Sequence, residues 1–177
     1  MVFNYLSWQM QYRVIILSIF CFSLSLLSAQ EKDEQEAINL VYLEAGGFGG
    51  FGSLNYERLV FTKDYFQVGS RLGLGLNRFK DFRNKFNPDI SIPIGVNFAY
   101  GTRIKGEIGI GTTYTNIVHA GPSLGVERSS EIHGNLLIGV RFQKRERGAL
   151  FRLGYSPIFE KFSKIRHWPY ISFGWSL

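Results

Sequence analysis

The sequence predicts an all-β protein in which eight antiparallel strands follow one another up and down and close into a barrel. Eight segments of the 177-residue chain alternate between apolar and small or polar residues. This period of two is typical of strands with one apolar face, and no 3.6-residue helical period separates the segments. An even number of strands lets an up-and-down sheet close on itself.

The first predicted element is a signal peptide at residues 1–29. Arg13 precedes the uncharged run VIILSIFCFSLSLL, and the small residue Ala29 stands before the polar run QEKDEQE. A basic residue, a short apolar run and a small residue before a polar start are typical of a secretory signal. We therefore expect cleavage after Ala29, so that residues 30–38 form a short N-terminal segment ahead of a barrel at residues 39–177.

Three alternatives concern this N-terminus. Met10 is a second candidate start, because a signal that begins there is more compact. A retained membrane anchor would need a longer apolar run. A lipid attached to Cys21 would require a small residue where Phe20 stands. Cleavage would leave the mature chain without cysteine and therefore without disulfides.

The barrel strands follow from the alternation, which is clearest in DISIPIGVNFAYG at residues 89–101. The second strand is less regular, because Leu59 and Phe61 fall on its polar face. Pro93 cannot donate a ladder hydrogen bond, so we expect a bulge near a rim there. The predicted strands are residues 39–47, 53–61, 65–77, 89–101, 104–115, 132–143, 151–156 and 171–177.

The glycine-rich stretch between the first two strands resembles a nucleotide-binding loop. Gly47, Gly49 and Gly52 match the G-x-G-x-x-G spacing. That loop needs a helix directly after it, so that the helix N-terminus faces the phosphates. The residues that follow, SLNYERLVF, alternate as a strand. The sequence therefore favours a tight hairpin in which glycines adopt positive φ.

We expect the apolar face of the barrel to point outward. The opposite face is rich in glycine, which weakens a solvent-facing strand but suits a narrow lumen. Strands of about ten residues, when tilted, also cross a bilayer core, which favours a transmembrane barrel. The glycine-rich face carries charges of both signs, expected to form a lumen ion-pair network of Glu44, Glu57, Arg71, Lys105, Glu107, Arg141 and Arg152.

The connections favour the same arrangement. Residues 62–64, 101–103 and 144–148 are short turns at one end, and residues 78–88, 116–131 and 158–168 are long loops at the other. Short periplasmic turns and long external loops are typical of outer-membrane barrels, and would place residues 30–38 in the periplasm. Aromatic residues near the strand ends predict an interfacial girdle of Tyr65, Phe66, Phe98, Tyr100, Tyr155, Trp168 and Tyr170.

From about residue 39 to residue 177, the chain resembles the small eight-stranded members of the outer-membrane β-barrel family. The final strand, PYISFGWSL, is similar to that family's C-terminal signature, although Leu177 stands where an aromatic residue is common. The resemblance implies export by a signal peptide, insertion by the barrel assembly machinery, and contact with outer-membrane lipids. It carries no implication about chemistry.

An eight-stranded barrel has an interior that side chains fill. We therefore expect the inward charges to form a structural network, with a narrow polar path as the alternative. The expected role is that of a monomer that is structural or that recognises a surface partner through its long loops. A formal charge of +6, spread evenly along the chain, is too modest to indicate nucleic-acid binding.

One long loop is a candidate contact with an anionic surface. Four cations, Arg78, Lys80, Arg83 and Lys85, face a single acid, and phenylalanines stand between them. Phosphates of lipopolysaccharide at an outer-leaflet rim are the candidate partner. The alternative is a solvated loop anchored by its aromatic residues.

We expect no enzyme activity, no cofactor and no metal site. One alternative is an outer-membrane lipid hydrolase with a rim Ser/His site, because His119 and His133 lie near Ser123, Ser129, Ser130 and Glu131 in the sequence. These residues match no known nucleophile motif. A second alternative is a secreted soluble barrel that binds an apolar ligand, with its faces reversed.

Overall fold

The computed structural model describes residues 38–121, 125–144, 147–159 and 165–177. The predicted signal peptide and residues 30–37 lie outside this part of the chain. Within it, no helix is both long enough and apolar enough to span a membrane.

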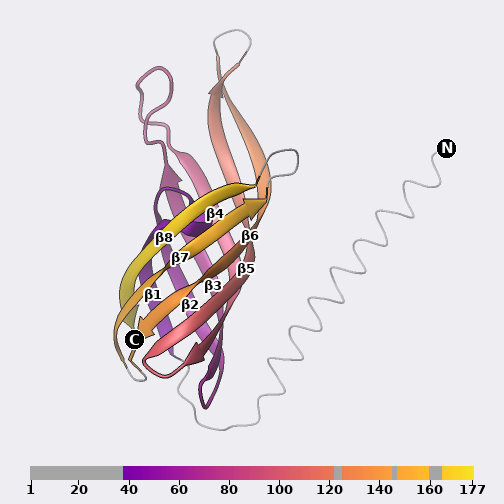
Figure 1. Ribbon diagram of the computed structural model, residues 1–177. Helices are drawn as coiled ribbons and strands as arrows, with labels where there is room; N and C mark the ends of the chain where they lie inside the picture. Colours follow the sequence, from indigo (N-terminus) through magenta and orange to yellow (C-terminus); the bar gives the residue numbers. More distant parts are fainter. Residues whose placement is uncertain (1–37, 122–124, 145–146, 160–164) are drawn as a thin grey trace, which may run out of the picture. The chain divides into compact units, whose positions relative to one another are not determined.

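The described residues form a closed antiparallel barrel in which each strand pairs with the next and β8 pairs with β1 (Figure 1). The predicted eight-stranded up-and-down fold is thus confirmed. The closing ladder runs from Leu40–Ser176 to Gly46–Tyr170. The elements are β1 (Asn39–Gly46), the 3-10 turn η1 (Gly47–Gly49), β2 (Ser53–Lys63), β3 (Phe66–Asn77), β4 (Asp89–Gly101), β5 (Ile104–Ala120), β6 (Val126–Gln143), β7 (Gly148–Phe159) and β8 (Arg166–Ser176).

The barrel is apolar outside and polar inside. Leu43, Leu74 and Ile138 point outward and are between 54% and 65% exposed, whereas the inward Glu57 and Arg141 are 0% exposed. A soluble barrel has the opposite arrangement, because its large apolar residues fill the core. The glycine-rich face is therefore the lumen face, as the alternation predicted.

Glycines on the inner face leave space that large inward side chains occupy. A Cβ added to Gly139 would lie 2.2 Å from the Tyr170 hydroxyl oxygen, and one added to Gly174 would lie 2.3 Å from Tyr42 Cβ. Tyr170 is 3% exposed and shares the inner face of β8 with Ser172. Its predicted place in the outward aromatic girdle is therefore wrong.

The irregular alternation of β2 comes from a bulge. Its pairing with β3 shifts between Leu59 and Phe61, so that Val60 and Phe61 are both exposed while Leu59 is buried. Leu59 packs inside the barrel with Leu40, Tyr42 and Leu150. An extra residue in one strand reverses the facing of every residue after it, which explains the broken pattern.

The predicted bulge at Pro93 is wrong. The β3–β4 register is the same at Leu72–Ile94 and at Gly75–Ser91, and the bridges between these pairs are absent. Proline lacks the backbone N–H that such a bridge would use. The sheet accommodates Pro93 by omitting these bridges, and the strand keeps its register.

β5 and β6 are longer than predicted, with 17 and 18 residues. Their ladder continues from Ile104–Phe142 to Ala120–Val126, so most of the expected loop at residues 116–131 is a two-stranded ribbon. The ribbon projects beyond the other strands beside the β3–β4 loop (Figure 1). Of its described side chains only Val118 is buried. With so little apolar burial, its sequence lacks the alternation that identified the other strands.

Candidate functional site

The first part of the candidate site is a set of inward charges near the middle of the lumen. Glu44 Oε1 lies 2.9 Å from Arg71 Nη2, and its Oε2 lies 3.7 Å from Arg152 Nη1. Arg152 also donates through Nε and Nη2 to Glu107, each at 2.9 Å. Two carboxylates on distant strands are therefore joined by one guanidinium.

Arg141 extends this set of ion pairs. Its Nη2 lies 2.7 Å from Glu57 Oε1 and also contacts Glu107 Oε1. Glu57 accepts a further hydrogen bond from Asn97 Nδ2 at 2.7 Å. The six side chains alternate in sign, have no exposed area, and run in the order Arg71–Glu44–Arg152–Glu107–Arg141–Glu57. We call this the lumen ion chain.

Lys105, the seventh predicted lumen residue, points inward near the short-turn rim. It is 2% exposed, and its Nζ donates to Gln67 Oε1 at 2.7 Å. The register places Lys105 beside Arg141. The structure thus places all seven predicted residues on the inner face and joins six of them by ion pairs.

Aromatic rings stack on the lumen ion chain. The Arg152 guanidinium carbon lies 4.7 Å from the Tyr42 ring centroid and 5.6 Å from that of Tyr170. The Arg71 guanidinium carbon lies 4.7 Å from the Phe48 ring centroid. These cation–π contacts occupy guanidinium faces where the carboxylates cannot bind. No role in the lumen was predicted for these rings.

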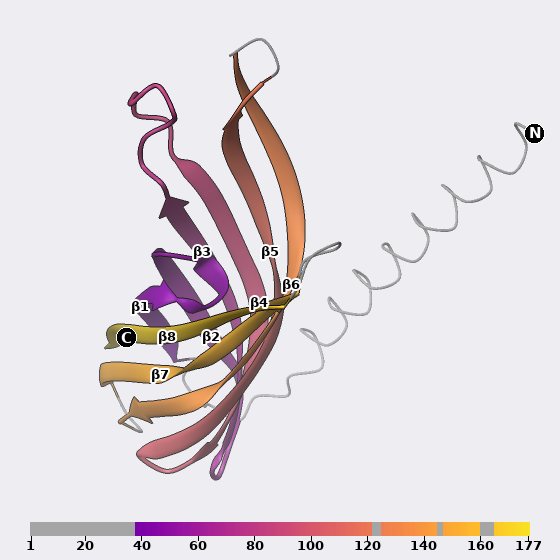
Figure 2. The same ribbon diagram turned by 45° about the horizontal axis from the view of Figure 1, so that its top comes forward.

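The glycine-rich link is a plug and not the predicted tight hairpin. Residues 47–49 form η1, which folds inward from the barrel wall (Figure 2). Phe48 is 1% exposed, and its carbonyl accepts a hydrogen bond from Thr113 Oγ1 at 2.8 Å. The carbonyl of Gly49 accepts one from Ser91 Oγ at 2.7 Å. Positive φ at Gly46, Gly47 and Gly50 permits this fold.

The inward fold of residues 47–49 was not predicted. The sequence offers a single, weak signal for it, a phenylalanine flanked by glycines. Gly95 and Gly111 make room for its ring, since an added Cβ would lie 2.9 Å and 2.8 Å from Phe48 Cε2. A strand, β2, follows the glycine-rich stretch, as predicted. The α-helix that a nucleotide-binding loop requires at this point is therefore replaced by a strand.

The β3–β4 loop, the predicted anionic contact, is a small ordered hairpin. Asp81 Oδ1 accepts hydrogen bonds from the backbone N–H groups of Arg83 and Lys85, at 2.9 Å and 3.0 Å. The Lys85 amide hydrogen bond is the main cause that lowers the pKa of Asp81 below its usual value. The one acid of the loop is thus directed at the backbone, while Phe79, Phe82 and Phe86 are exposed.

Contacts across the long-loop rim fix the β5–β6 ribbon to this loop. Arg128 on β6 donates to the Pro88 carbonyl at 3.2 Å and to the side chains of Asn87 and Asn116. Asp89 Oδ1 accepts from the Val118 N–H at 2.7 Å. That N–H lies beyond the end of the β4–β5 ladder, which stops at Ile90–Asn116. Asp89 therefore caps one edge of the ribbon.

Among the described residues, His133 and His119 contact groups other than a serine hydroxyl. His133 Nε2 lies 2.8 Å from Thr115 Oγ1, and His119 Nε2 lies 3.8 Å from Glu127. Ser130 Oγ instead contacts the Tyr114 hydroxyl at 2.8 Å and Asn116 Nδ2 at 2.9 Å. Ser123 lies outside the described residues. Within the described ranges, no three His, Cys, Asp or Glu side chains gather closely enough to hold a metal ion.

The chain matches no protein-family model and no curated protein. Among solved structures, it is similar to the N-terminal β-barrel domain of Pseudomonas aeruginosa OprF. That match has a TM-score of 0.58 and 12% identity, and covers 81% of this chain and 98% of that chain. At 12% identity this similarity is informative about the fold alone, and it supports the eight-stranded barrel.

Two further matches have lower structural similarity. Ail, the attachment invasion locus protein of Yersinia pestis, matches with a TM-score of 0.48 and 10% identity, over 79% of this chain and 93% of that chain. Neisserial surface protein A matches with a TM-score of 0.46 and 10% identity, over 80% of this chain and 94% of that chain.

Proposed function

We propose that this protein is an integral outer-membrane β-barrel with a closed lumen, which acts in recognition at its long-loop rim. The observation that carries the membrane location is the inverted burial. Outward Ile94, Ile110 and Phe173 are more than half exposed, while guanidinium and carboxylate groups fill the inside. Apolar surface of this extent is stable only against another apolar phase. The tilted strands are long enough to cross a bilayer core.

The proposed role of the lumen ion chain is structural. Six ionised groups neutralise one another, and Phe48 and Tyr170 pack among them, so that side chains occupy the space a permeating solute would need. An eight-stranded barrel is narrow enough to be filled in this way. We therefore favour a closed lumen over a narrow polar path, and a role that involves no catalysis.

Fractionation and labelling test the location. The mature protein is expected in the outer-membrane fraction, with heat-modifiable mobility in detergent gels, after insertion by the barrel assembly machinery. An amine-reactive reagent that cannot cross the membrane should modify Lys80 in intact cells. Labelling of Lys80 only after permeabilisation would reverse the proposed orientation. Recovery of the protein in solution without detergent would favour the soluble barrel.

We propose that the β3–β4 loop binds phosphates of lipopolysaccharide. The loop presents four cations, of which Arg78 lies 3.9 Å from Asp89, and three exposed phenylalanines on a backbone that Asp81 organises. Cations supply attraction to phosphate that weakens with salt, and the rings suit the boundary between head groups and acyl chains. The Arg128 contacts hold the loop against the ribbon, so less ordering is needed on binding.

A matched pair of double variants tests the loop. Arg83→Gln with Lys85→Gln is expected to weaken retention of lipopolysaccharide about thirtyfold at low salt, at roughly 1 kcal/mol per cation near a charged surface. The control is Arg103→Gln with Lys144→Gln, which removes the same charge at the opposite rim. Equal losses in both pairs would contradict a specific loop site, as would unchanged binding after the phosphates are removed from the lipid.

The hydrolase alternative has its own test. Expression of the protein would have to alter lipid A, and His133→Ala or His119→Ala would have to abolish the change. We expect unaltered lipid A in all three cases, because Ser130 is bonded to Tyr114 and Asn116.

A further inference from the structure

A groove on the outer wall lies where β2, β3 and β4 reach the short-turn rim. It has a volume of about 510 Å³ and is lined by Phe61, Lys63, Asp64, Tyr65, Phe66 and Tyr100. Its rings support one another, with centroids 6.2 Å apart for Phe61–Phe66 and 6.3 Å apart for Tyr65–Tyr100. The groove is thus a preformed, mostly aromatic surface with one lysine and one acid at its edge.

The strand register explains how this groove forms. Lys63 pairs with Phe66, and Phe66 pairs with Tyr100, so that these outward side chains make one row across three strands. The bulge at Val60 brings Phe61 onto the same face. A lysine in such a row lays its aliphatic stem along the rings and holds its ammonium at the polar boundary.

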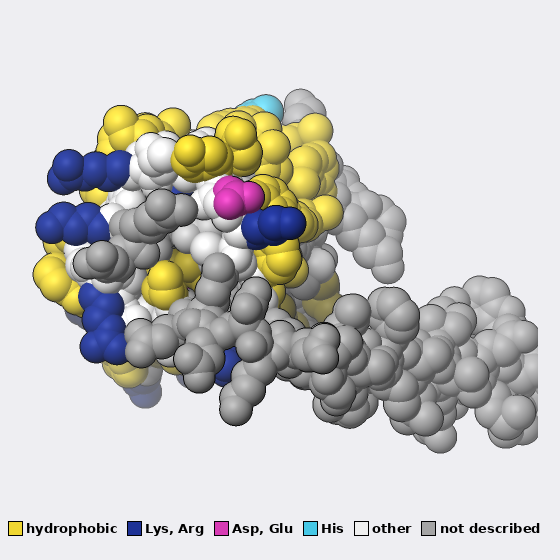
Figure 3. Space-filling view, turned by 90° about the horizontal axis from the view of Figure 1, so that it is seen from below, with side chains coloured by type: hydrophobic (Ala, Val, Ile, Leu, Met, Phe, Trp, Pro, Cys, Tyr) yellow, Lys and Arg dark blue, Asp and Glu magenta, His cyan; other side chains and the backbone are white. Residues whose placement is uncertain are grey.

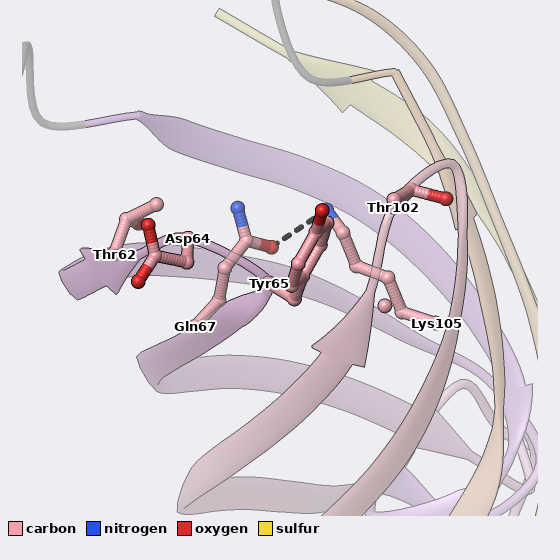
Figure 4. Close-up of a pocket in the computed structure, with 7 residues that line it drawn as sticks. Thr62, Asp64, Tyr65, Gln67, Thr102 and Lys105 are labelled. Carbon is pink, nitrogen blue, oxygen red and sulfur yellow. Dashed lines mark hydrogen bonds between the residues drawn. The ribbon is translucent and has the colours of Figure 1, made fainter.

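A small cavity with several polar side chains in its lining adjoins the groove. It has a volume of about 60 Å³ and is lined by Thr62, Asp64, Tyr65, Gln67, Gly101, Thr102 and Lys105 (Figure 4). That is room for about four water molecules. Asp64 and Tyr65 line both the cavity and the groove. The cavity lining therefore includes hydroxyl groups, the hydrogen-bonded pair Lys105–Gln67 and the Asp64 carboxylate, beside an aromatic surface.

The charge at this rim suits an anion. Among the described residues of the short turns and their flanks, Lys63, Arg103, Lys144 and Arg147 stand against Asp64. Figure 3 looks at this rim and shows Lys and Arg side chains at its edge, with hydrophobic side chains on the outer wall. A ligand that matches both features is anionic at one end and apolar at the other.

We propose that this site holds one anionic phospholipid of the leaflet that meets the short-turn rim. An acyl chain lies along the aromatic groove, and the phosphate lies between Lys63 and the small cavity. The inference rests on the proposed membrane location. A lipid fits better than a free phosphate, because most of the groove offers no polar partner and opens onto the barrel's lipid-facing wall.

Lipid selectivity of the mature full chain tests the proposal. The protein is reconstituted in phosphatidylcholine vesicles with spin-labelled phosphatidylglycerol or spin-labelled phosphatidylcholine, and the motionally restricted fraction of each label is measured. One lysine near the surface predicts about a fivefold preference for phosphatidylglycerol. Lys63→Gln should abolish most of that preference. Tyr100→Ala should lower the restricted fraction of both labels.

Lys144→Gln is the matched control, since it removes the same charge from the same rim at a different turn. Because Lys144 does not line the groove or the cavity, this variant should lower the preference much less than Lys63→Gln does. No preference in the wild type, or an equal loss in Lys144→Gln, would overturn the site. Release of the labelled lipid by millimolar inorganic phosphate would show a small-anion site instead. Heat-modifiable mobility separates the two proposals: a protein that does not insert refutes both, whereas one that inserts without selectivity refutes only this one.

Discussion

The lumen and the long-loop rim both contain arginines and carboxylates, but they use them differently. In the lumen, Arg141 joins Glu57 and Glu107 from strands far apart in the sequence, and all three side chains have no exposed area. At the rim, Asp81 binds backbone N–H groups two and four residues away and is only partly buried. Burial makes ion pairing necessary in the lumen, because water cannot solvate a buried charge that lacks a partner.

The largest expected effect comes from breaking the lumen ion chain. Glu107→Gln would remove the negative charge that neutralises the buried Arg141 and Arg152. It should lower the free energy of unfolding by about 3–5 kcal/mol. Urea unfolding in lipid vesicles measures it. Glu131→Gln, on the exposed ribbon, should change stability by less than about 0.5 kcal/mol. A similar loss for both would refute the contrast between lumen and rim.

Removal of the Phe48 ring, which lies in η1, should have the next largest effect. Phe48→Ala deletes a fully buried ring that stacks on Arg71, and should cost about 3 kcal/mol in the same unfolding assay. Phe51→Ala is the control, since that ring lies in the same link but is 72% exposed. Wild-type stability of Phe48→Ala would show that η1 is not part of the packed lumen.

A smaller, local effect is expected at the ribbon. Asp89→Ala removes the acceptor of the Val118 N–H. The free energy that protects the Val118 amide from hydrogen exchange should fall by about 1 kcal/mol, so that this amide exchanges roughly fivefold faster. Amides in the barrel section of β5, such as that of Gly109, should exchange as before. A barrel-wide change would mean that the ribbon and the barrel open together.

The smallest effect is the pH dependence of the β3–β4 loop. Hydrogen bonds from the Lys85 and Arg83 amides lower the pKa of Asp81 below its usual value of 3.8. A depressed pKa in the folded state means that this contribution to loop order is complete above that usual value. It is lost as the pH falls through the folded pKa. The Arg83 and Lys85 amide resonances should therefore stay constant from neutral pH to about pH 5 and shift below about pH 4. Asp81→Ala should abolish that shift, and its persistence would assign the change to another group.

Much of the barrel could be predicted from the sequence, because the facing of a strand residue depends only on its position in the alternation. That rule placed Arg71 and Arg152 inside and Leu74 and Ile138 outside. It failed for residues after the β2 bulge and for the ribbon. In the first case, one extra residue reverses the alternation, and in the second no apolar core imposes it.

The sequence by itself determined the strand number, the glycine-rich inner face and the residues that carry the lumen charges, since these follow from local periodicity. Only the tertiary structure decided which carboxylate meets which guanidinium, because those pairs depend on the stagger of strands whose paired residues, such as Glu44 and Arg152, are far apart in the sequence. It also decided that Phe48 turns into the lumen. The ring finds its space only where Gly95 and Gly111, on neighbouring strands, face it across the closed barrel.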